Sequence, residues 1–222
     1  MTSSVHHIFA MCYAPSTGLF VFDYYANKWG LIAGNTFTHV AGTGVGSSDD
    51  GAGLSASFPS QLNSCAFGNG ALWMTAPSSR IRKMIVGGSY TVSSPFSEVF
   101  QKLKDITYVA VTDKLYITDE SNSVVREMSA SGNGNDITTI AGGRTGFQAN
   151  NATYIGSPFG ITSDEAGVLY VVDKQNRHVF SVRIPVSQTS TPTLSHEATD
   201  TPSSSPTITP PPTPTQSQET TG

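Results

Sequence analysis

The chain has 222 residues, of which 13% are charged, with 12 Lys and Arg against 16 Asp and Glu. From residue 187 onward it contains acids but no Lys or Arg, so the preceding part is nearly neutral and lacks the basic excess of a nucleic-acid-binding surface. No run of about 18 apolar residues is present, so no transmembrane helix is expected. Residues 1–15 lack the basic start of a secretory signal, which predicts either synthesis without one or a chain that begins inside a longer product.

Four apolar runs recur along the chain. They are rich in β-branched and aromatic residues, three of them end in Asp, and they occupy residues 19–23, 72–76, 115–119 and 169–173. Their last residues lie 53, 43 and 54 positions apart. A repeat of this length is typical of propeller blades.

Each run has a strand on either side of it in the predicted pattern. The preceding strands are expected at residues 8–13, 63–67, 106–111 and 159–162, and the following ones at 28–32, 80–85, 123–128 and 177–182. A fourth strand follows in two units, at 37–42 and 137–142, and leads into the Gly-rich connectors 43–58 and 143–154. The sequence Arg80-Ile81-Arg82-Lys83 alternates apolar and basic residues, which we interpret as the outward surface of a strand.

The fold class predicted is therefore all-β, a β-propeller of about four four-stranded antiparallel blades, partial or open. The blades are expected at residues 5–42, 43–96, 97–142 and 143–186. An open ring would expose apolar blade faces and strand edges, so we expect a fragment of a longer propeller, with a small closed ring or association of copies as the alternatives.

The unit resembles the NHL repeat, a β-propeller blade. The resemblance rests on Ser157-Pro158-Phe159-Gly160-Ile161, on the Leu-Tyr-Val-x-Asp run that ends at Asp173, and on Asn176. Asp49-Asp50-Gly51, the Ala-Gly loops at residues 41–42 and 141–142, and residues 80–84 add to it. It implies a ring of about six blades and covers roughly four-fifths of the chain. Ala76-Pro77 departs from the pattern where Asp is expected.

The 36 residues from 187 to 222 have a different composition, with 11 Thr, 7 Ser and 7 Pro. Such a segment buries too little apolar surface to fold, so we predict a disordered tail. Thr, Ser and Pro together are typical of O-glycosylated stalks, and a plain flexible linker is the alternative.

The two cysteines are predicted to be free. Cys12 and Cys65 each lie seven residues before the apolar run of their unit, which suggests equivalent places on adjacent blades. Equivalent points on neighbouring blades are expected roughly 8–12 Å apart, beyond the Cα separation of about 7 Å that a disulfide tolerates. Two buried, small apolar side chains are the expected result.

No cofactor or metal is expected. Adjacent His6 and His7 point to opposite faces of a strand, and no second cluster at ligand spacing accompanies them. Asp49 and Asp50 begin like a calcium loop but lack its later ligands. The Asp residues that end three of the four runs are interpreted as repeated turn hydrogen bonds rather than catalytic groups.

The sequence favours a non-catalytic interaction module that binds a protein or glycan through its loops, at a cell surface on a glycosylated stalk. The candidate binding residues lie in the two connectors: Asp49, Asp50, Arg144, Phe147 and Asn150. Asn151 is the candidate N-glycosylation site, which favours an extracellular location. A fragment of a propeller lyase or hydrolase, or an intracellular NHL-type scaffold in the cytoplasm, are the alternatives.

Overall fold

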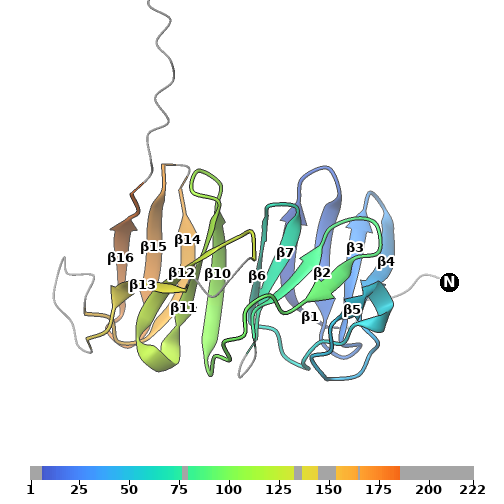
Figure 1. Ribbon diagram of the computed structural model, residues 1–222, viewed down its shortest axis with the longest axis horizontal. Helices are drawn as coiled ribbons and strands as arrows, with labels where there is room; N and C mark the ends of the chain where they lie inside the picture. Colours follow the sequence, from blue (N-terminus) through green and yellow to red (C-terminus); the bar gives the residue numbers. More distant parts are fainter. Residues whose placement is uncertain (1–6, 77–79, 133–136, 145–153, 165, 186–222) are drawn as a thin grey trace, which may run out of the picture. The chain divides into compact units, whose positions relative to one another are not determined.

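The computed structural model describes residues 7–76, 80–132, 137–144, 154–164 and 166–185, and these form four antiparallel sheets (Figure 1). The predicted tail, residues 187–222, lies outside the described part. The predicted all-β fold is confirmed: the helical turns among the described residues are the short 3-10 turns η1 (Gly53–Ser55) and η2 (Glu120–Asn122).

The first and third sheets are four-stranded meanders. The first contains β1 (Ile8–Ala14), β2 (Gly18–Asp23), β3 (Lys28–Ala33) and β4 (Thr36–Ala41), in that order. The third contains β10 (Leu103–Val109), β11 (Lys114–Asp119), β12 (Val124–Ser129) and β13 (Thr138–Gly142), also in chain order.

The second and fourth sheets vary this plan. The second has the order β5 (Gly51–Ala52), β9 (Thr91–Ser93), β8 (Arg82–Ile85), β7 (Ala71–Thr75) and β6 (Ser64–Gly68). The fourth has three strands, β14 (Pro158–Ser163), β15 (Val168–Asp173) and β16 (His178–Arg183). The described residues thus form four blades, where the NHL resemblance implies about six.

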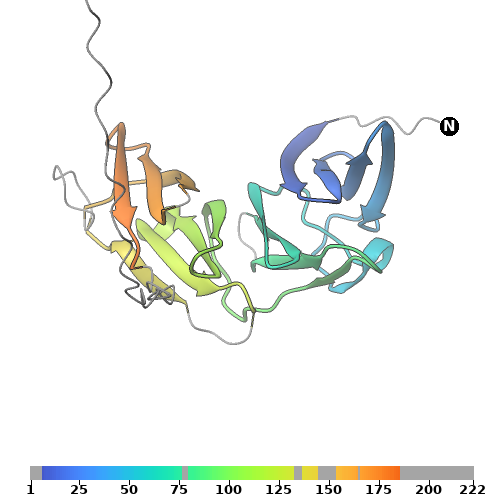
Figure 2. The ribbon, with the colours of Figure 1, turned by 90° about the horizontal axis from the view of Figure 1, so that it is seen from above.

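Three buried clusters join each sheet to the next, as in a propeller. Phe20, Phe22 and Trp29 of the first sheet pack against Leu72 and Met74 of the second. The second cluster joins β7 to β11, and the third joins β11 and β12 to β15. Figure 2 shows the sheets following one another in chain order. A blade with two apolar faces cannot bury both alone, so each neighbour supplies part of the core.

The Asp residues that end β2, β11 and β15 make the predicted turn hydrogen bonds. Asp23 accepts from the backbone N–H of Ala26 at 3.1 Å, and Asp119 from that of Asn122 at 3.2 Å. Asp173 accepts from the N–H of Asn176 at 3.2 Å. The repeated turn hydrogen bonds inferred from their recurrence are confirmed.

The expectation of two free cysteines is wrong, because Cys12 and Cys65 form a disulfide with a Cα–Cα distance of 6.1 Å. The equal spacing of seven residues places the two cysteines at equivalent positions only if the hairpin turns of the two blades have the same length. Ala14 pairs with Gly18 whereas Gly68 pairs with Ala71, so the first turn is one residue longer.

This extra residue places the two cysteines on opposite faces of their own sheets. Cys12 lies opposite Phe20, on the face toward the second blade, and Cys65 lies opposite Met74, on the face toward the first. Because β1 and β6 pack side by side, the two sulfurs meet across the junction.

Candidate binding site

The connector that follows β4 is anchored to the second blade by Arg82. Its guanidinium donates to the carbonyls of Asp49 at 2.9 Å and Ser57 at 3.2 Å, and pairs with the Asp50 carboxylate at 3.1 Å. It also lies over the Phe58 ring. The interpretation of this basic segment as an outward surface is therefore wrong for Arg82, which is fully buried.

The predicted binding residues Asp49 and Asp50 lie together around this cation. Asp49 accepts from the Ser57 hydroxyl at 2.8 Å, and Asp50 accepts from the backbone and hydroxyl of Ser94, each at 2.9 Å. The hydrogen bond from Ser57 is the main cause that lowers the pKa of Asp49 below its ordinary value. These contacts tie the connector to β8 and to the segment after β9.

The connector that follows β13 carries the other predicted residues. Arg144 forms an isolated backbone bridge with Tyr154, and its guanidinium lies 5.9 Å from the centre of that ring. Gly46 and Phe58 make the corresponding bridge in the earlier connector. Phe147, Asn150 and Asn151 lie outside the described residues.

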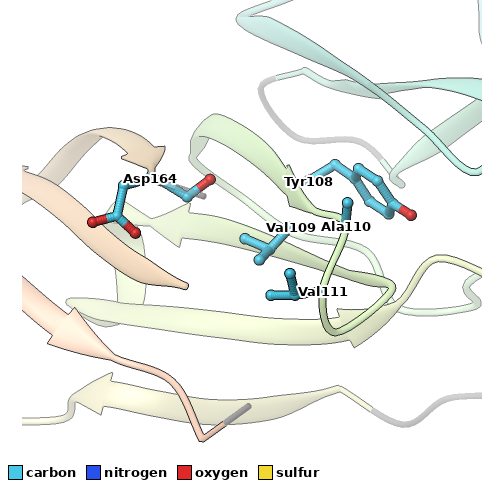
Figure 3. A pocket seen from close by; sticks show the side chains of 6 residues that line it. Tyr108, Val109, Ala110, Val111 and Asp164 are labelled. Carbon is cyan, nitrogen blue, oxygen red and sulfur yellow. The ribbon is translucent and has the colours of Figure 1, made fainter. Parts of the chain in front are cut away.

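A pocket of about 260 Å³ lies between the third and fourth blades (Figure 3). It is lined by the end of β10, by the turn after it, and by the end of β14: Tyr108, Val109, Ala110, Val111, Ser163 and Asp164. Val109 is buried and forms an apolar wall, while Val111 is exposed beside it. Figure 3 shows Asp164 across the pocket from these two valines.

Hydrogen bonds fix the polar groups at the pocket. The Asp164 carboxylate accepts from the Val168 N–H at 2.8 Å and from the Tyr170 hydroxyl at 3.2 Å. The first of these bonds is the main cause that lowers the pKa of Asp164, so this group is ionised at neutral pH. Burial, together with the hydrogen bond from its hydroxyl to Asp113, raises the pKa of Tyr108.

The packing of Tyr108 depends on a glycine of the second blade. Its ring occupies the space that a Cβ atom at Gly68 would fill. The hydroxyl of Tyr108 donates to Asp113 at 2.9 Å, so the ring is held at both ends. The ring therefore lies against the second blade, on the face of β10 opposite the pocket.

The pocket and the predicted connectors lie at opposite ends of the strands. The pocket is built from the β10–β11 and β14–β15 hairpin turns, whereas the connectors lead to the beginnings of β6 and β14. Sequence reasoning missed the pocket because its residues belong to the ends of ordinary strands. The available signal was Val111, an apolar residue directly before the polar turn Thr112-Asp113.

No helix among the described residues has the length and apolar character needed to cross a bilayer. Across the same residues, no group of three or more His, Cys, Asp or Glu side chains is arranged to hold a metal ion.

No family model and no curated protein matches the chain. Several solved structures share its fold. An auxiliary nutrient binding protein from Bacteroides thetaiotaomicron has a TM-score of 0.61 at 13% identity, with 79% of this chain and 47% of that chain covered. A nidogen/laminin complex has a TM-score of 0.59 at 16% identity, with 81% and 61% covered.

Virginiamycin B lyase from Staphylococcus aureus has a TM-score of 0.50 at 14% identity, with 81% of this chain and 56% of that chain covered. The chain thus spans between 47% and 61% of the length of these three. At such identities the likeness shows the β-propeller fold.

Proposed function

We propose that this protein is a non-catalytic binding module, in which a rigid propeller presents its loops to a protein or glycan partner. The observation that carries the proposal is the pocket between the third and fourth blades. It combines the apolar side chains of Val109 and Val111 with the ionised carboxylate of Asp164. Apolar lining with a few fixed polar groups is characteristic of ligand sites.

The chemistry of the pocket indicates what a partner would present. An apolar group would contact Val109 and Val111, and a donor next to it would reach Asp164. A peptide with an apolar side chain beside a basic one has this pattern, as does a sugar whose apolar face lies against the two valines. Similar folds occur in an auxiliary nutrient binding protein and in a nidogen/laminin complex, which supports a binding role by analogy alone.

We further propose that the module works outside the cell or at its surface. The Cys12–Cys65 disulfide supports this location, because disulfides persist in oxidising compartments. The Thr/Pro/Ser composition of residues 187–222 and the sequon at Asn151 agree with a glycosylated stalk and surface. Intact-mass and glycan analysis of the native protein tests this part: an unmodified chain from the soluble fraction of cells would contradict it.

The binding role is tested by presenting the multimerised full chain to a glycan array and to intact cells. Val111→Glu places a second carboxylate beside Asp164 and is expected to reduce bound signal at least tenfold, about 1.4 kcal/mol. The matched control is Val45→Glu, at a valine of the connector after β4 that is 63% exposed, against 56% for Val111.

If the Val45 variant loses binding and the Val111 variant retains it, the binding site lies on the connectors and not at the pocket. If neither glycans nor cells bind the unaltered chain, the proposed function is wrong.

A further inference from the structure

The outermost faces of the first and fourth blades carry exposed apolar side chains. On the first blade, Met11 and Tyr13 of β1 are each 66% exposed. On the fourth, Tyr170 is 41%, Val172 43% and Val179 57% exposed. None of these five side chains is charged, although charges are the usual protection for exposed strands.

The strand register relates the exposed residues of the fourth blade to buried residues of the other blades. Tyr170 is the second residue of its apolar run, equivalent to Phe20, Trp73 and Tyr116. Those three are fully buried, and Phe20 and Trp73 lie in the clusters that join their blade to the following one. Tyr116 lies in the cluster that joins the third blade to the fourth.

Val179, in the third strand of the fourth blade, is likewise equivalent to residues that are buried in other blades. It pairs with Val172 as Val125 pairs with Thr118 and as Trp29 pairs with Phe22. Trp29 and Val125 are fully buried by the following blade. The exposed residues of the fourth blade therefore occupy positions that, in the other blades, are buried against the following blade.

The first blade presents the complementary side. Met11 lies opposite Val21, as Cys65 lies opposite Met74 and Ile106 opposite Ile117. Cys65 and Ile106 pack against the preceding blade in each case. Met11 and Tyr13 are thus in positions that contact a preceding blade.

From this equivalence we infer that a second copy of the chain covers both faces. The fourth blade of each copy packs on the first blade of the other, repeating the junction already present three times within the chain. Two four-blade chains related by a two-fold axis close a ring of about eight blades, within the range of known propellers. A second copy is the occupant that the structure favours, because one chain carries both complementary sides. The inference does not depend on the proposed function.

Sedimentation velocity of the full chain over a wide concentration range tests the inference. The unaltered protein is expected to reach twice the chain mass of 23.4 kDa and to form no larger species. Met11→Glu and Val172→Glu each place a charge in both junctions of the pair, so each variant alone is expected to be monomeric. Val45→Glu, at an exposed site away from both faces, is the control and should still pair.

An equimolar mixture of the two monomeric variants distinguishes head-to-tail pairing from other modes. One of the two junctions is then free of substitutions, so a pair should reappear with an affinity at least tenfold weaker than that of the unaltered chain. Pairing lost in only one variant would mean that like faces meet, and this would overturn the inference. A monomer at every concentration would overturn it as well, and circular dichroism establishes that each variant is folded.

Discussion

At the scale of single residues, the Cys12–Cys65 bond connects the first two blades covalently across their shared core. The cysteines are 53 residues apart, so the bond closes a long loop in the unfolded chain. We expect its removal to lower the free energy of unfolding by roughly 2–4 kcal/mol. Urea unfolding with and without a reductant measures this difference.

The double variant Cys12→Ala, Cys65→Ala is the control for the reductant. It should unfold at the lower urea concentration under both conditions. Equal midpoints for the oxidised and reduced forms of the unaltered protein would show that the bond contributes nothing.

The hydrogen bonds that Asp173 accepts are expected to make the stability of the protein depend on pH. Burial alone would raise its pKa, but the N–H groups of Gly156 and Ser157 and the Asn176 side chain overcome this and hold the pKa below its ordinary value. A carboxylate with a lowered pKa in the folded state stabilises the protein above the unfolded value of about 3.9, and this contribution is lost as the pH falls through the folded pKa.

We therefore expect Asp173→Asn to be less stable than the unaltered protein at pH 7, by about 2 kcal/mol, and to lose less stability below about pH 4. Urea midpoints between pH 7 and pH 3 measure both effects. Glu98→Gln, at a half-exposed ion pair with Arg126, is the control and should change little. An unchanged slope below about pH 4 in the Asp173 variant would contradict the assignment.

At the scale of elements, the Ala-Gly pairs that end β4 and β13 have a steric cause. Gly42 and Gly142 have φ angles of 111° and 90°, and a Cβ atom at either would strike the backbone of the turn before the third strand. This close approach fixes where the fourth strand leaves the sheet. It explains why the same dipeptide recurs in the first and third units.

The two adjacent glycines at the end of β13 allow the cost of this close approach to be measured. Gly142 and Gly143 have φ angles of 90° and 94°, but a Cβ atom at Gly143 meets nothing within 4 Å. Both Ala variants carry the left-handed backbone cost of about 1–2 kcal/mol, and only Gly142→Ala adds a clash. We expect its thermal midpoint to be clearly the lower of the two. Equal midpoints would mean that the close approach is unimportant.

The sequence predicts the repeat well because each blade carries its own local signals. These signals are the turns after the Asp residues, the Ala-Gly pairs and the apolar runs. Each depends on contacts within one blade and not on the neighbouring blades. The disulfide and the burial of Arg82 could not be predicted in this way, since both depend on contacts between elements. A single extra turn residue before Gly18 reverses the face on which Cys12 lies. The pocket was missed for the same reason, because its two walls come from different blades.

At the scale of the whole molecule, one packing relation repeats from blade to blade. The second residue of each apolar run faces the following blade, and the alternate residues of the first strand face the preceding one. Within the chain this relation is satisfied at three junctions. The same relation leaves Met11 and Tyr13 at one end and Tyr170, Val172 and Val179 at the other, ready for further blades.

Hydroxyl-radical footprinting of the full chain across a range of concentrations tests this relation most directly. We expect Trp73 and Tyr116 to be protected at every concentration, and Met11 and Tyr170 to react in dilute solution and to become protected together as the concentration rises. Tyr25, which is 70% exposed, should react equally at every concentration. Reactive Tyr116 in the dilute protein, or protection of Met11 without Tyr170, would contradict this packing relation.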